Sequence, residues 1–94
     1  MSAISVVMGS KSDWPTVKEA CRILDQFGVD YDKHVISAHR MPQEMFAFAQ
    51  GAVAAGTKVI IACAGGAAHL PGMIAANTPL PVIGIPGQTK ALGG

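Results

Sequence analysis

Short apolar segments alternate along the chain with longer segments in which apolar residues recur at helical spacing. Four of these segments have the length of a β-strand, and the nearly continuous apolar character of the first is typical of a strand covered on both faces. These predicted strands are Ile4–Met8, Tyr31–Ile36, Val59–Ala64 and Pro81–Ile85. The third is apolar without interruption from Val59 to Cys63, which predicts a central place in the sheet.

The segments between the strands carry helix signals. Ser12 can cap the first helix, Asp13 then falls in its first turn, and Gly28 ends it. The predicted helices run from Ser12 to Gly28, from Pro42 to near Gly56, and from Pro71 to Ala76. Strands that alternate with helices predict an α/β fold, a doubly wound parallel sheet of flavodoxin-like order with three layers, α/β/α. We expect residues 1–94 to form a single domain of this kind.

Small and polar residues gather directly after three of the predicted strands. The three clusters are Gly9–Asp13, Ser37–Arg40 and Gly65–Gly72. Parallel strands place their carboxyl ends at one edge of a sheet, so clusters that are far apart in the sequence can converge there on one crevice. We therefore expect a ligand site at this edge.

Composition narrows the choice of ligand and partner. The chain has 94 residues, of which 50% are hydrophobic and 14% charged, and its net charge is +1. The low charged fraction predicts that part of the surface is an interface between copies. A net charge this small, without a run of Lys or Arg, argues against a nucleic-acid partner. We expect a small charged ligand instead.

The sequence also bears on location and on the cysteines. It shows neither a signal-peptide pattern nor an apolar run near the roughly 20 residues of a membrane span, so we expect a cytoplasmic protein with no membrane partner. Cys21 and Cys63 lie far apart in the sequence and lack the Cys-x-x-Cys spacing. In a reducing compartment this pattern predicts two small buried side chains.

The first cluster combines two hydroxyls with the start of a helix. Free backbone N–H groups at a helix N-terminus suit a phosphate, and the hydroxyls of Ser10 and Ser12 suit a sugar. Asp13 would repel a phosphate, but its carboxylate can accept hydrogen bonds from ribose hydroxyls. Its alternative role is ordinary stabilisation of the first helical turn.

The second cluster places an imidazole beside a guanidinium. Arg40 can bind a phosphate through two parallel hydrogen bonds, and His39 can transfer a proton in either direction near neutral pH. The alternative is a surface loop with a solvated Arg40 and a histidine of no special role. His34 differs, because it lies within a predicted strand, and we expect it to be structural.

The third cluster is the most specific. Gly65 and Gly66 allow the backbone to approach a ligand closely, and the small Ala67 and Ala68 leave room for a planar group. His69 then stands at the start of a helix. It either contributes to the site or caps that helix, and these residues alone leave both open.

Together the three clusters closely resemble the bacterial, class I N5-carboxyaminoimidazole ribonucleotide mutases of purine biosynthesis. The segments that carry the resemblance are Gly9–Trp14, Ser37–Arg40, Ala64–Met73 and Leu80–Pro86. Arg40 and His69 favour this class over the animal-type carboxylases. The resemblance implies an isomerase of IMP biosynthesis that forms homo-octamers and uses no metal, nucleotide or redox cofactor.

The resemblance also implies a reaction and roles for the residues. The carbamate of the ribonucleotide loses CO2, the CO2 stays in the site, and C4 of the aminoimidazole attacks it before losing its proton. His39 is then the general acid-base residue. The resemblance assigns the ribose-phosphate end to Ser10 and Asp13, and the phosphate to Arg40 with Ser37. It places the third loop around the base and CO2, through Gly65, Gly66, His69 and Leu70.

The chain departs from the family pattern in two respects. Met41 stands where Thr is usual, Cys63 where Gly is usual and Gly87 where an apolar residue is usual. The family also continues with a fifth strand, another site loop and C-terminal helices, so we expect these residues to be the N-terminal portion of the family domain. A non-catalytic phosphate- or nucleotide-binding module of flavodoxin-like fold, or an inactive fragment, is the alternative.

Overall fold

Strands and helices alternate throughout the part of the chain that the computed structural model describes, which is residues 3–36, 42–65 and 69–87. This order confirms the predicted α/β pattern. The elements are β1 (Ile4–Met8), the 3-10 turn η1 (Lys11–Asp13), α1 (Trp14–Gln26), β2 (Tyr31–Val35), α2 (Pro42–Gly51), β3 (Val59–Gly65), α3 (His69–Ala75) and β4 (Val82–Gly87).

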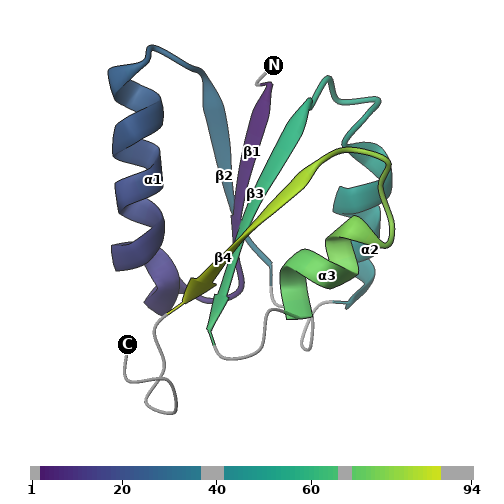
Figure 1. The fold of residues 1–94 in the computed structure, drawn as a ribbon. Coiled ribbons are helices and arrows are strands. Elements are labelled where there is room, and N and C mark those ends of the chain that lie inside the picture. The colour runs from purple at the N-terminus through teal and green to yellow at the C-terminus, as the bar shows by residue number, and fades with distance from the viewer. Residues whose placement is uncertain (1–2, 37–41, 66–68, 88–94) are drawn as a thin grey trace.

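The strands form one parallel sheet in the order β2-β1-β3-β4 (Figure 1). This is the flavodoxin-like order that the sequence predicts. In the register, Met8 of β1 lies between Val35 of β2 and Cys63 of β3. β1 and β3 occupy the centre, as the unbroken apolar run of β3 indicated. All carboxyl ends of the strands therefore lie at one edge, the lower edge in Figure 1.

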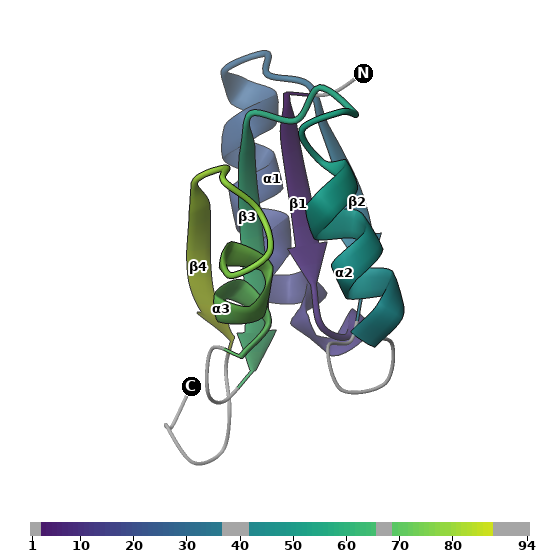
Figure 2. The same ribbon diagram turned by 90° about the vertical axis from the view of Figure 1, so that its right-hand side faces the viewer.

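Helices cover both faces of the sheet, which gives three layers. α1 lies on one side, and α2 and α3 lie together on the other (Figures 1 and 2). Alternate residues of β1 enter different cores: Val6 and Met8 pack toward α1 with Val17, Cys21 and Cys63. The opposite core contains Val7, Met45, Ala49, Ile60, Ala62 and Ile74. Cys21 and Cys63 are both buried and free, as expected.

Two glycines with positive φ close turns of the same kind, one directly after α1 and the other five residues beyond the end of α2. After α1, Gly28 has a φ of +67°, and the N–H groups of Gly28 and Val29 donate to the carbonyls of Asp25 and Leu24. Beyond α2, Gly56 has a φ of +91°, and the N–H groups of Gly56 and Thr57 donate to the carbonyls of Val53 and Ala52. These are Schellman caps, which need a residue that tolerates positive φ. The stop predicted at Gly28 is therefore confirmed. The end predicted near Gly56 was wrong, because α2 ends at Gly51 and residues 52–56 form turns instead of continuing the helix.

The third helix begins earlier than predicted. It starts at His69, whereas the sequence suggested Pro71 as its first residue. Proline is tolerated throughout a first helical turn, because the N–H groups there have no partner within the helix. No helix in the described segments is long and apolar enough to cross a membrane.

Candidate functional site

Backbone hydrogen bonds join the carboxyl ends of β2, β1 and β3. The N–H of Gly9, the first residue after β1, donates to the carbonyl of Cys63 over 3.0 Å. On the other side, the N–H of Ile36 donates to the carbonyl of Met8 over 2.9 Å. The loop after β1 therefore lies between the ends of β2 and β3, at the place where the sequence predicted that the clusters converge.

The first cluster folds into a compact turn around Ser10. The N–H of Ser12 donates to Ser10 Oγ over 3.2 Å, and the N–H of Ser10 donates to Asp13 Oδ2 over 3.1 Å. This reciprocal pair is a capping box. The cap is therefore Ser10, and the prediction that Ser12 caps the helix was wrong. The sequence missed this because a 3-10 turn, Lys11–Asp13, precedes α1 and moves the cap two residues toward the N-terminus.

Asp13 lies at the base of the turn and is only 8% exposed. One of its oxygens is held by the N–H of Ser10, which fixes the direction of the carboxylate. The stabilising role that the sequence left open is thus present. It does not exclude ligand binding, because a carboxylate has two oxygens and can accept further hydrogen bonds.

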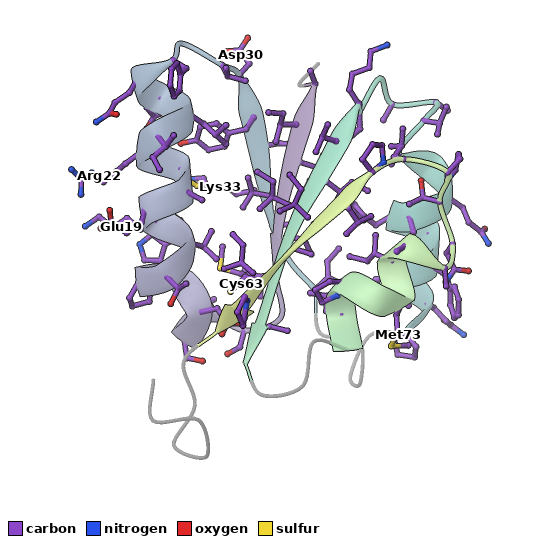
Figure 3. The ribbon with its side chains drawn as sticks, in the orientation of Figure 1. Glu19, Arg22, Asp30, Lys33, Cys63 and Met73 are labelled. Carbon is purple, nitrogen blue, oxygen red and sulfur yellow. The ribbon has the colours of Figure 1, made fainter. Side chains whose placement is uncertain are left out.

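The first cluster lies against the end of β3, directly before the third cluster. A Cβ placed on Gly9 would lie 3.8 Å from both Asp13 Oδ2 and the Cβ of Ala64. Cys63 points from β3 toward the α1 side and is 1% exposed (Figure 3). Burial, and secondly the charge of Asp13, raise the pKa of the Cys63 thiol to about 11. The thiol at this junction is therefore protonated at neutral pH and packs as an apolar group.

The third cluster begins at Gly65, the last residue of β3, which pairs with Gly87 at the end of β4. His69 is the first residue of α3, and Leu70 follows it with an exposure of 2%. Leu70 packs in the core beneath α3 with Ile74 and Met45. Its side chain therefore anchors the start of the helix against the sheet.

Several predicted site residues lie outside the described residues. They are Ser37, His39 and Arg40 of the second cluster, Met41 beside them, and Gly66 of the third loop. Their neighbours are described on both sides: Ile36 is hydrogen-bonded to the end of β1, and Pro42 begins α2. The assigned roles of these residues remain predictions.

His34 is the fourth of the five residues of β2 and contacts α2, and its structural role stays a prediction. Its Nε2 is 2.9 Å from Asp32 Oδ1, and its ring centroid is 5.0 Å from that of Phe48 on α2. The sequence did not predict this contact between His34 and Asp32. Both residues lie two positions apart in β2 and therefore on the same face of the strand, so the two-residue period of a strand could have predicted that they are neighbours.

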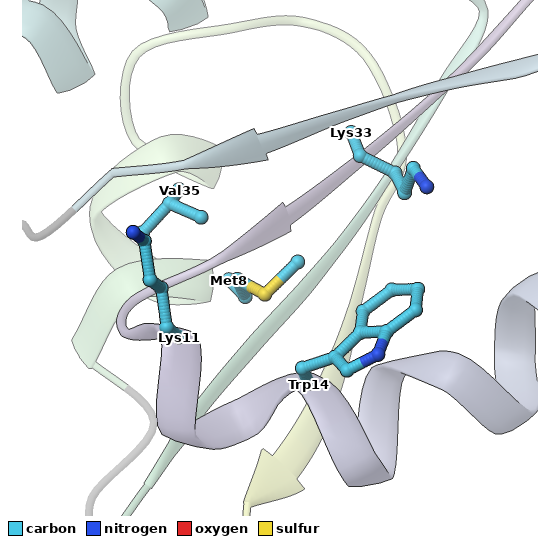
Figure 4. A pocket seen from close by; sticks show the side chains of 5 residues that line it. All are labelled: Met8, Lys11, Trp14, Lys33 and Val35. Carbon is cyan, nitrogen blue, oxygen red and sulfur yellow. The ribbon is translucent and has the colours of Figure 1, made fainter.

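Sequence reasoning also missed a pocket that adjoins the first cluster. Its lining includes Lys11 of the turn and Trp14 at the start of α1, together with side chains from β1 and β2 (Figure 4). Only the register of the two strands brings these residues together.

Comparison with known proteins gives a consistent result. The family model of AIR carboxylase matches residues 3–94. The N5-carboxyaminoimidazole ribonucleotide mutase of Bacillus subtilis is 62% identical over 97% of this chain and 56% of its own length. The protein of that name from Thermotoga maritima is 53% identical over 100% of this chain and 55% of its own length. The chain thus spans about half the length of the curated relatives it matches.

A solved structure agrees in fold. The crystal structure of Treponema denticola PurE superposes with a TM-score of 0.85 over 95% of this chain and 57% of that chain, at 23% sequence identity. At this identity the likeness supports the arrangement of strands and helices. Membership of the family is shown by the family model and the curated relatives.

Proposed function

Because the chain belongs to the AIR carboxylase family, we propose that it provides the N-terminal part of an N5-carboxyaminoimidazole ribonucleotide mutase. The reaction is conversion of N5-carboxyaminoimidazole ribonucleotide to 4-carboxy-5-aminoimidazole ribonucleotide, a step of purine biosynthesis. The observation that carries this proposal is 62% identity to a curated mutase over nearly the whole chain. We further propose that residues 1–94 are the first part of a single flavodoxin-like domain.

His39 is proposed as the proton-transfer group. Loss of CO2 from the carbamate breaks the N–C bond and leaves an electron pair on the nitrogen, which takes up a proton. Attack of C4 on the retained CO2 forms the new C–C bond, and the proton on C4 must then leave. One imidazole can give the first proton and accept the second, because its reference pKa of about 6.5 lies close to neutral pH. No net proton is consumed.

The remaining roles concern binding. Ser10 and Asp13 are proposed to hold the ribose-phosphate end, because the capping box fixes their positions at the carboxyl edge of the sheet. Arg40, with Ser37, is proposed to bind the phosphate, since its planar guanidinium matches two phosphate oxygens. Gly65, Gly66, His69 and Leu70 are proposed to surround the base and CO2. A closed pocket there would keep CO2 near C4 for the second step.

We also propose that the protein works as a cytoplasmic homo-oligomer, an octamer by its resemblance to the family. Support for an interface comes from large apolar side chains on the surface of the described residues. Phe27 is 77% exposed, and Ile23 and Ile83 are each 53% exposed. Sedimentation of the chain together with its natural continuation would give the subunit number.

The test of the activity is an ultraviolet assay of the carboxylated ribonucleotide, run on the parent and on His39→Asn. We expect turnover in the parent and a loss of about 10²–10⁴-fold in the variant, with substrate affinity kept within several-fold. Arg40→Ala is the matched binding variant, and its affinity should fall by tens-fold because it loses a charge-assisted contact. Near-normal turnover by His39→Asn would refute the role of His39. Binding by the parent with no turnover would indicate a non-catalytic module or fragment instead.

A further inference from the structure

A pocket of about 370 Å³ lies beside the candidate site, on the α1 face of the sheet. Met8, Lys11, Trp14, Lys33 and Val35 line it (Figure 4). None of these residues has a role in the proposed reaction. Its volume is within the range of about 300–1,000 Å³ that is usual for small-molecule sites.

The strand register explains why these side chains meet. Met8 pairs with Val35, and Val6 with Lys33, so Lys33 and Val35 project from the face that carries Val6 and Met8. β2 is an edge strand, and α1 lies over this face. Trp14 begins α1 and therefore forms the wall opposite Lys33 and Val35.

The pocket has an apolar floor between two cations. Met8, which is 4% exposed, lies between Val35 and the indole of Trp14. The side chains of Lys11 and Lys33 are on opposite sides of Met8 (Figure 4). The ammonium nitrogen of Lys33 lies 5.1 Å from the centroid of the Trp14 ring, a cation–π contact that keeps the charge at the rim. No acidic side chain is among the described residues that line the pocket.

We propose that this pocket binds a small planar molecule that carries an anionic group. The planar body packs on Met8, Val35 and the indole of Trp14, and the anion pairs with Lys33, with Lys11, or with both. Aromatic rings and thioethers favour planar apolar partners, and two cations with no acidic side chain among the described lining residues favour an anion. A nucleoside monophosphate and an aromatic carboxylate share this chemistry.

The test uses the fluorescence of Trp14, which is the one tryptophan of the chain. Adenosine 5′-monophosphate is titrated against the protein, with adenosine and inorganic phosphate as the uncharged and the ringless controls. Benzoate represents the aromatic carboxylates. We expect a saturable change with the nucleotide or with benzoate, and an affinity for adenosine and for phosphate that is lower by about tenfold or more.

Charge variants locate the binding. At least one of Lys33→Gln and Lys11→Gln should weaken binding by about fivefold or more, since the variant whose lysine pairs with the anion loses a charge-assisted contact. Lys58→Gln is the matched control, because Lys58 is also exposed but precedes β3 at the opposite edge of the sheet. It should leave the titration unchanged. Turnover in Lys33→Gln should stay at the parental value.

A further variant separates this pocket from the proposed ribonucleotide site. Arg40→Ala should weaken binding at that site but leave the Trp14 titration as in the parent. The proposal is overturned if Arg40→Ala abolishes the fluorescence change, because the probe then occupies the substrate site. It is also overturned if neither aromatic anion produces a saturable change, or if both lysine variants bind as the parent does.

Discussion

The buried thiol of Cys63 should make the protein less stable at alkaline pH. Cys63 is 1% exposed, and burial together with the charge of Asp13 raises its pKa from the ordinary 9.0 to about 11. In the unfolded chain the thiol ionises near pH 9, and in the folded protein near pH 11. Between these values the folded state binds more protons, so stability falls as the pH rises. Below pH 9 the contribution is fully present.

The size of the effect follows from the two pKa values. Ionisation near pH 9 in one state and near pH 11 in the other predicts a loss of about 1.3 kcal/mol between pH 8 and 10. The loss approaches about 2–3 kcal/mol above pH 11. Burial, and secondly a hydrogen bond with Asp25, raise the pKa of Tyr31 to about 12, so Tyr31 adds its own loss at higher pH. The window from pH 8 to 10 therefore reports mainly on Cys63.

The assay is urea unfolding at several pH values, followed by circular dichroism, on the parent and on Cys63→Ala. We expect the variant to lose the alkaline decline of about 1.3 kcal/mol, whatever its stability at pH 8. Cys21→Ala is the matched control, because Cys21 is also buried in the α1 core, and it should keep the decline. Asp13→Asn should reduce the decline only in part, since burial is the larger cause. Parallel pH profiles for the parent and Cys63→Ala would refute the reasoning.

Two further predictions concern helix ends and can be checked by the same urea unfolding. Ser10→Ala should destabilise the protein by about 0.5–2 kcal/mol because it removes the cap. Ser12→Ala should cost less, because among the described residues its hydroxyl is hydrogen-bonded to Ser10 Oγ, at 3.0 Å, and caps no backbone N–H. Equal losses would contradict the assignment of the cap. Gly51→Ala should stabilise α2 by about 0.5–1 kcal/mol, since the added Cβ meets no atom within 4 Å. Gly28→Ala should instead cost about 1–2 kcal/mol, because the φ of Gly28 is +67°. A stabilising Gly28→Ala would contradict the Schellman cap.

Element order and core could be predicted from the sequence because they depend on the period of the apolar residues. The alternation of Val6 and Val7 between two cores is an example, since both faces of β1 had to be apolar for the strand to be central. Boundaries were predicted less well. The 3-10 turn at Lys11–Asp13 and the start of α3 at His69 depend on local hydrogen bonds that the apolar pattern does not contain.

For the candidate site too, the overall arrangement could be predicted better than the local detail. Convergence of the clusters is expected from parallel strands, and the bond from Gly9 to Cys63 places the start of the first cluster beside the end of β3, directly before the third cluster. The environment of each side chain could not be predicted in this way. The contact of Lys33 with Trp14 depends on the register between β1 and β2, and the pair His34–Asp32 depends on which face of β2 turns toward α2. The apolar pattern of one sequence does not show how two strands are aligned, nor which side chains face each other across them.

The position of Asp13 explains how one residue can serve both the fold and a ligand. Its carboxylate closes the capping box through Ser10, and its charge also acts on Cys63 at the end of β3. The turn that carries the hydroxyls is thereby fixed against the central strand before any ligand arrives. A site held in this way loses little conformational freedom on binding, which favours affinity for a small polar ligand. Asp13→Asn should accordingly weaken ligand binding more than it lowers stability, because an amide can still accept the bond from Ser10 but lacks the charge.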